Sequence, residues 1–314
     1  MRKALVVGIN NYPKAELSGA VRDATEIANV LERHGDGSPN FDIKLITDPP
    51  VTITKALLRE NIEALFKGKS DISLLYFSGH GFVNSLGGYI VTPDYQKYDE
   101  GISMDDILKY ANESETRDKI IILDCCHSGA FGSPKLTGGY SALGEGVTVL
   151  TASKEDESAI EIGGRGVFTS LLIDALQGGS ADLRGHITPG SIYSYIDSAL
   201  GPWDQRPVFK TNVSTFISLR QIFPPVPLEI LRKLKEYFES PTNEYKLDPS
   251  YEFTDDSAID EHVETFKNLQ EFESVGLVVP VGEEHMYFAA MNSKSCRLTA
   301  LGYQYWRLVK ENKI

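Results

Sequence analysis

The sequence has few cysteines, and they lack the paired spacing of common zinc ligands. Only three occur among 314 residues, at Cys125, Cys126 and Cys296. Adjacent cysteines rarely pair with each other because the linkage is strained. An odd count without a pairing framework indicates a reduced, cytoplasmic setting. Zinc stays an alternative, although Cys125, Cys126 and His127 are consecutive and would point in different directions along an extended chain.

Positive charge and long apolar runs are also lacking. The net charge is −13 and the pI is near 5.0, which argues against a nucleic-acid surface over the whole chain. The apolar run near the N-terminus, residues 4–9, is too short for a signal peptide or a membrane span. A hydrophobic content of 41% and an aromatic content of 10% are typical of a globular protein with a substantial core.

Apolar runs alternate with helical patterns in the first two thirds of the chain. Continuous apolar runs predict strands that are buried on both faces, and the strand–helix–strand order predicts a mainly parallel α/β sheet covered by helices. The expected strands are 4–9, 41–46, 71–77, 119–123 and 147–150, and the expected helices lie at 20–34, 57–66, 104–110, 168–176 and 192–200.

A proline-rich segment, residues 223–227, predicts a stiff spacer between two domains. We therefore expect domains at 1–222 and 223–314. In the second, amphipathic helices precede two apolar stretches, 277–280 and 286–290, which predict a short hairpin around 281–285. Helices followed by a two-stranded hairpin resemble a winged helix, a small α+β module.

The charge of this second domain favours a protein partner over DNA. It holds 10 Lys and Arg against 16 Asp and Glu. The helix that would enter a groove carries four glutamates, at 261, 264, 271 and 273, against Lys267 alone. Such a face would repel phosphates. We expect a protein-binding or regulatory module, with a DNA reader as the alternative.

Two polar motifs follow buried strands. Ser78-Gly79-His80-Gly81 follows 73–77, and Asp124-Cys125-Cys126-His127-Ser128-Gly129 follows 120–123. The carboxyl ends of parallel strands meet at one edge of a sheet, where α/β proteins place their chemistry. A thiol and an imidazole brought together there would form a nucleophile and its base. The alternatives are a hydrogen-bonded turn histidine and buried core cysteines.

These motifs resemble the caspase-like cysteine peptidases, most closely the bacterial-type metacaspase branch. The resemblance covers residues 1–217 and extends to further stretches: 19–24, Thr92-Pro93-Asp94, Thr151-Ala152-Ser153, 166–169 and Gln205-Arg206-Pro207. It implies that His80 is the general base, Cys126 the nucleophile, Gly81 an oxyanion-hole residue and Cys125 a bystander.

The resemblance also implies a specificity. Asp23 and Asp124 match two acids that line the pocket for the residue before the scissile bond. Two carboxylates there would prefer Arg or Lys; the alternatives are a helix first-turn acid and a strand-end acid. Residues 129–146 are rich in Gly, Ser and Pro and predict an exposed loop, either a plain connection or a cleavage loop. Lys135 in this loop is then the first self-cleavage candidate.

By the same resemblance, no cofactor is required. Calcium is an alternative, with Asp94, Asp105 and Asp106 as its ligands, although residues 131–134 lack an acid. We therefore predict a cysteine endopeptidase that cleaves protein or peptide substrates after Arg or Lys, in regulated proteolysis of a defence or cell-death type. The rival prediction is a non-catalytic scaffold that acts through residues 223–314. Neither nucleic acid nor membrane is expected as a partner.

Overall fold

The computed structural model describes residues 1–314 except 14, 98, 126–142, 153–160, 163–164 and 202–205. The described chain forms two compact units. One contains residues 1–182 and 186–222, and the other contains residues 183–185 and 223–314. None of the helices within the described ranges is long and apolar enough to cross a membrane.

A six-stranded sheet forms the centre of the first unit. Its strands lie in the order β12-β8-β7-β3-β1-β2, and all neighbours are parallel except β12 and β8. This confirms the mainly parallel α/β sheet. The strands are β1 (Arg2–Ile9), β2 (Asp42–Asp48), β3 (Ile72–Ser78), β7 (Asp118–Asp124), β8 (Val147–Thr151) and β12 (Val208–Asn212).

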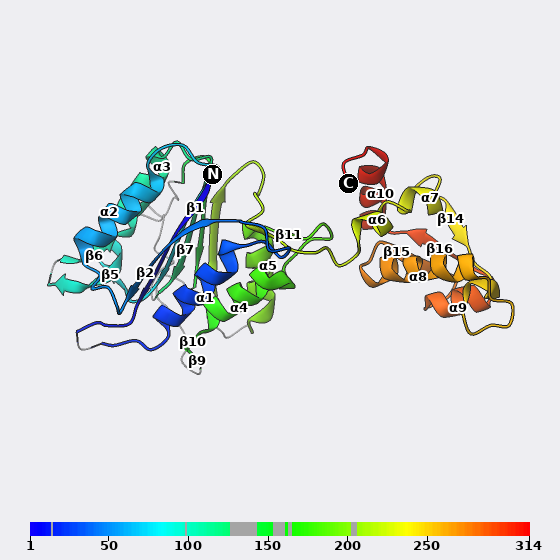
Figure 1. Cartoon of the computed structure of the whole chain (residues 1–314), viewed down its shortest axis with the longest axis horizontal. Coiled ribbons are helices and arrows are strands. Elements are labelled where there is room, and N and C mark those ends of the chain that lie inside the picture. The colour runs from blue at the N-terminus through cyan, green and yellow to red at the C-terminus, as the bar shows by residue number, and fades with distance from the viewer. Residues whose placement is uncertain (14, 98, 126–142, 153–160, 163–164, 202–205) are drawn as a thin grey trace. The chain divides into compact units, whose positions relative to one another are not determined.

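Helices cover both faces of this sheet, as Figure 1 shows. On one face lie α2 (Lys55–Phe66) and α3 (Met104–Glu113), and on the other lie α1 (Ala20–Glu32), α4 (Val167–Asp174) and α5 (Pro189–Ala199). Successive residues of the strands point to alternate faces. In β7, Ile121 and Leu123 therefore pack in the core under α2 and α3, while Ile120 and Ile122 pack in the core under α1 and α4.

The register between β3 and β7 aligns the ends of these two central strands. Ser78 pairs with Asp124, so both strands end at the same level. Both strands are buried along their whole length. Burial of apolar side chains on both faces is the main stabilising contribution to such a sheet. Gly79 and Cys125, the residues that directly follow these strands, consequently leave them at the same edge of the sheet.

A second sheet and several short pairs accompany the main sheet. The strands β4 (Gly81–Asn84), β5 (Gly87–Gln96) and β6 (Asp99–Ser103) form an antiparallel meander. Further short segments are β9 (Glu161–Ile162) with β10 (Arg165–Gly166), β11 (His186–Ile187) with β13 (Arg220–Gln221), and a π-helical turn (Ala175–Gly179).

The second unit has a core of its own, built from helices around a three-stranded antiparallel sheet of order β14-β16-β15. Its elements are α6 (Leu228–Leu231), α7 (Leu234–Tyr237), β14 (Glu244–Lys246), a 3-10 turn (Pro249–Tyr251), α8 (Asp260–Ser274), β15 (Val278–Val281), α9 (Met286–Met291), β16 (Ser295–Leu298) and α10 (Ala300–Lys310).

The expected hairpin of this unit is wrong in its second strand. Residues 286–290 form helix α9, and the strand that pairs with β15 is β16. Within α9, Met286, Ala289 and Ala290 are buried, at the three- and four-residue spacing of a helical face. A short apolar run does not by itself distinguish a strand from a helix, and here tertiary packing selects the helix. The winged-helix likeness stays a hypothesis.

Cys296 lies in β16, at the centre of the second core. Burial raises the pKa of its thiol to about 12, and the nearby Glu273 and Glu244 add to the shift. Since the thiolate is the reactive form, we expect alkylation by iodoacetamide at pH 8 to be at least roughly 100-fold slower at Cys296 than in the urea-unfolded chain. Peptide mapping by mass spectrometry measures both rates. Equal rates in the folded and unfolded protein would contradict this placement.

Candidate active site

The ends of β3 and β7 bring the two polar motifs together. The Gly79 N–H lies 3.4 Å from the Asp124 carbonyl oxygen, which extends the strand pairing by one residue. His80 therefore follows β3 directly beside the point where Cys125 follows β7. Cys126 and Lys135 lie outside the described residues. Cys125 is the last described residue before this gap, and the expected nucleophile is the next residue in the sequence.

His80 is held in one ring orientation. Its Nε2 lies 2.7 Å from the backbone oxygen of Ala15. A carbonyl oxygen can only accept a hydrogen bond, so Nε2 carries the proton and donates it. In the neutral ring, Nδ1 is then the unprotonated nitrogen and the one able to take a proton. This is the arrangement that a general base requires, with an orienting acceptor behind it.

Tyr12 is the residue that sequence reasoning missed. Its hydroxyl accepts a hydrogen bond from the His80 N–H at 3.1 Å and donates to the Val91 carbonyl at 3.2 Å. Its ring packs edge-on against the imidazole, with centroids 4.5 Å apart. Burial raises the pKa of this phenol, with a smaller contribution from the neighbouring Cys125, so the hydroxyl stays protonated. The only sequence signal for Tyr12 is its place just past the first strand, in a stretch whose composition indicates a turn.

Gly79 makes the approach of Tyr12 possible. A Cβ atom at this position would overlap the Tyr12 hydroxyl and lie 2.8 Å from the Phe77 ring. Any larger residue would therefore separate His80 from the phenol that holds its backbone. Gly81 follows as the first residue of β4 and is partly buried beside His80. Its place next to the imidazole is compatible with the expected oxyanion role, which requires a backbone N–H near the reacting carbonyl.

Asp23 and Asp124 come from distant parts of the sequence and lie around the same glycine. Their side chains belong to α1 and to the end of β7, and they are only 3% and 6% exposed. The Gly166 N–H donates to Asp23 Oδ2 at 3.2 Å. A Cβ atom on Gly166 would lie 2.5 Å from Asp124 Oδ2 and 3.2 Å from Asp23 Oδ2. The two carboxylates therefore share one small region beside the N-terminus of α4.

A chain of hydroxyls supports the Asp124 carboxylate. Thr169 Oγ1 donates to Asp124 Oδ2 at 2.6 Å. The Tyr76 hydroxyl lies 2.6 Å from the same Thr169 oxygen. Tyr76 must be the donor in this hydrogen bond, because the only hydroxyl proton of Thr169 is already donated to Asp124. Burial, followed by the charges of Asp124 and Asp23, raises the pKa of Tyr76 well above its ordinary value. The two acids thus occupy a region with concentrated negative charge.

Cys125 points away from these acids. Its side chain is 1% exposed and packs in the core under α2 and α3. Asp124, the preceding residue, belongs to the opposite face because successive strand residues alternate. A thiol surrounded by core residues is a poor nucleophile, which is compatible with a bystander role for Cys125.

The three acids expected for calcium do not form a common site. Asp94 accepts the Lys55 N–H at the start of α2, at 3.0 and 3.1 Å to its two oxygens. Asp106 pairs with Arg59 at 2.6 Å. Burial, followed by the charge of Asp106, raises the pKa of Asp105. The described ranges contain no group of three or more His, Cys, Asp or Glu side chains placed to hold a metal ion. The calcium expectation thus finds no support here.

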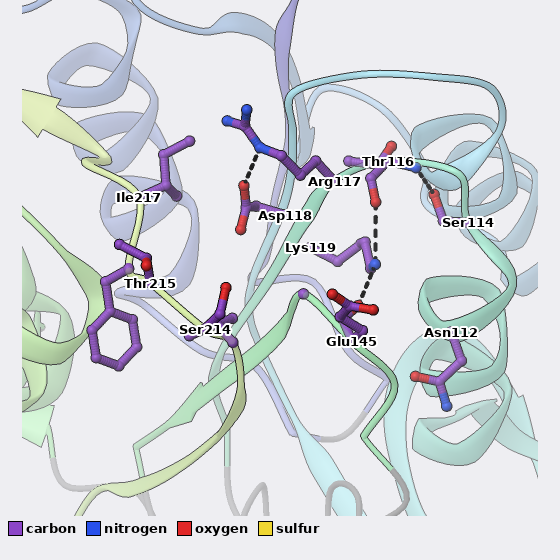
Figure 2. A pocket seen from close by; sticks show the side chains of 13 residues that line it. Asn112, Ser114, Thr116, Arg117, Asp118, Lys119, Glu145, Ser214, Thr215 and Ile217 are labelled. Atoms are coloured by element: carbon purple, nitrogen blue, oxygen red, sulfur yellow. Dashed lines mark hydrogen bonds and ion pairs between the residues drawn. The ribbon is translucent and has the colours of Figure 1, made fainter.

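A cavity lies at the other end of the main sheet, where β7 begins. It measures about 680 Å³ and is lined by the start of β7 and by residues 213–217. In Figure 2, Arg117 pairs with Asp118, and Lys119 donates to the backbone oxygens of Thr116 and Glu145. Its described lining includes neither Cys nor His. The edge that carries His80 is therefore the stronger candidate for covalent chemistry.

The Tyr12 hydroxyl offers a test of this geometry. Tyr12→Phe leaves a partly buried N–H at His80 and a carbonyl at Val91 without this partner, which costs about 1–3 kcal/mol. Native-state hydrogen exchange of β3 and β7 amides should show that loss. Tyr110→Phe is the control, because it removes a hydroxyl that bonds Glu63 on the surface. Equal effects of the two substitutions would contradict a supporting role for Tyr12.

Comparisons with known proteins agree with this architecture. A family model described as caspase domain, Peptidase_C14, matches residues 1–213. No curated protein matches the chain. Two solved structures have similar folds. The protein GSU0716 from Geobacter sulfurreducens has a TM-score of 0.52 at 15% identity, covering 71% of this chain and all of its own. Caspase-1 from Spodoptera frugiperda has a TM-score of 0.50 at 12% identity, covering 70% of this chain and 90% of its own.

The structural likenesses support the caspase-like fold, and the family model covers two thirds of the sequence, including both polar motifs. The chain belongs to the caspase domain family of cysteine peptidases.

Proposed function

We propose that this protein is a cysteine endopeptidase that cleaves protein or peptide substrates after Arg or Lys, in a reducing, cytoplasmic setting. The observation that carries the proposal is the alignment of two strand ends. His80, with its Nε2 proton directed to Ala15, lies beside the chain that leads through Asp124 and Cys125 into Cys126. Membership of the caspase domain family supports the same class of chemistry.

The reaction follows from the ring orientation of His80. Nδ1 takes the proton from the Cys126 thiol, and the thiolate attacks the carbonyl carbon of the scissile bond. His80 then donates that proton to the leaving amine, and the C–N bond breaks to give an acyl-enzyme. A water molecule, deprotonated by His80, then adds to the acyl carbon, the C–S bond breaks to release the acid product, and the imidazolium returns its proton to the Cys126 thiolate. A backbone N–H near Gly81 would stabilise the oxyanion, and one such donor is worth about 3 kcal/mol in acyl transfer.

The specificity rests on Asp23 and Asp124. Both carboxylates lie against Gly166, because the absence of a Cβ atom there lets their oxygens approach its backbone closely. A guanidinium or ammonium group offers several donors to paired carboxylates, and such charge-assisted bonds are about twice as strong as neutral ones. A substrate acid in the same region would instead meet like charge. Lys135 is the first candidate for self-cleavage under this specificity.

A panel of fluorogenic peptides that end in Arg, Lys, Asp or Leu tests the proposal. We expect turnover of the Arg and Lys peptides only, and a loss on the order of 10⁴-fold or more in Cys126→Ala and His80→Ala. Asp124→Asn should lower the Arg kcat/KM by roughly 10- to 100-fold, since a charge-assisted bond is lost. Asp174→Asn, an exposed acid on α4, is the matched control.

The outcomes of this panel separate the alternatives. Equal turnover by Cys126→Ala would overturn the nucleophile, and cleavage after Asp or Leu alone would overturn the acidic pocket. No turnover of any peptide by the wild-type protein would favour the rival class, a non-catalytic scaffold.

We also propose that the second unit binds a protein and not nucleic acid. Glu261, Glu264 and Glu271 are exposed on α8, and Glu264 pairs with Lys233 at 3.6 Å. In fluorescence anisotropy with duplex DNA at low salt, we expect no salt-dependent binding. The double substitution Glu261→Lys and Glu264→Lys is the positive control. It should raise the affinity for DNA and so show that the assay can detect binding. Wild-type binding that weakens steeply with salt would contradict the proposal.

A further inference from the structure

A second cavity adjoins His80, on the side away from the two acids. It measures about 410 Å³. Most of its described lining is apolar or aromatic, and His80 itself contributes to the wall. The lining residues are Tyr12, Ala15, His80, Gly81, Phe82, Val91, Tyr95, Gln96 and Lys97.

The acids and this cavity belong to opposite faces of the main sheet. Asp124 shares its face with Ile120 and Ile122, whose core lies under α1 and α4. Tyr12 packs in the core under α2 and α3, and Val91 packs against that same core. A peptide that crosses the sheet edge at His80 would therefore present side chains to both regions, one on each side of the reacting carbonyl.

The chemistry of acyl transfer decides which substrate residue lies in the acidic region and which lies at the cavity. The residue before the scissile bond enters the acidic region, if the proposed specificity holds. The histidine base must deliver its proton to the leaving amine. The amine belongs to the residue after the scissile bond, so that residue has to lie against the imidazole. The cavity that His80 lines is then the space its side chain can enter.

We propose that this cavity is a binding subsite for a bulky apolar side chain on the residue immediately after the scissile bond. The inference rests on the proposed peptidase function and adds a second specificity to it. Cleavage would then depend on two adjacent residues, a basic one before the bond and an apolar one after it.

The aromatic walls account for the apolar preference. Phe82 is 39% exposed and Tyr95 is 40% exposed, so both rings leave apolar surface available to a ligand in this cavity. The Tyr95 hydroxyl is held by the Pro13 carbonyl at 3.2 Å. Tyr12 closes the wall with its own hydroxyl already bonded at Val91. Rings fixed in this way form a preorganised wall that loses little freedom when a side chain binds.

Internally quenched peptides test the subsite because, unlike simple fluorogenic peptides, they retain the residue after the bond. All carry Arg before the bond, followed by Leu, Phe, Gly, Asp or Lys. We expect kcat/KM for Leu and Phe to exceed that for Gly, Asp and Lys by about tenfold or more. In Phe82→Ala the Leu-to-Gly ratio should fall toward one. Leu86→Ala, an exposed apolar residue of the same hairpin outside the cavity lining, should keep the wild-type ratio.

The ratio separates this inference from the proposed function. Turnover that is equal for all five peptides, or fastest for Asp, overturns the subsite while the Arg preference stands. No turnover of any Arg peptide overturns the peptidase proposal, and the subsite with it. If Phe82→Ala does not fold, the wild-type ratios alone decide, and Phe82→Arg provides a second variant that should shift the preference toward Asp.

Discussion

The hydrogen-bonded pairing of β3 with β7 is the constraint on which the site depends. Because Ser78 faces Asp124, both strands end at one level. The same pairing continues from Gly79 to the Asp124 carbonyl. A slip of one residue would turn every side chain of one strand to the other face. Asp124 would then leave Gly166, and the apolar residues beneath it would leave their core. The apolar burial that stabilises the fold therefore also fixes the positions of the polar residues.

Residues on one face of the sheet hold His80, and residues on the other face hold the carboxylates of Asp23 and Asp124. Tyr12, which packs in the core under α2 and α3, holds the His80 backbone, and the backbone oxygen of the exposed Ala15 fixes the His80 ring. Under α1 and α4, Thr169 and Gly166 hold the two carboxylates. His80 and the two carboxylates are associated with opposite faces and therefore do not compete for the same space. The imidazole stays available for proton transfer while the carboxylates remain buried and hydrogen-bonded.

Sequence patterns predict the parallel sheet well because its strands are continuous apolar runs, and the motifs at their ends show where His80 and Asp124 lie. They do not predict Tyr12, since an aromatic residue in a turn has no periodicity and its partners are 68 and 79 residues away. They also fail at residues 286–290, where packing forms helix α9. The contact between Asp23 and the Gly166 backbone spans 143 residues, and no local sequence pattern predicts it; the family resemblance implies only that Asp23 and Asp124 lie together.

The identity of the nucleophile is the central claim, and covalent trapping tests it most directly. A peptide chloromethyl ketone that ends in Arg should alkylate one thiol, and peptide mapping by mass spectrometry identifies it. We expect one adduct, on Cys126, and none with a reagent that ends in Asp. An adduct on the buried Cys125 or Cys296, or equal labelling by both reagents, would contradict the account.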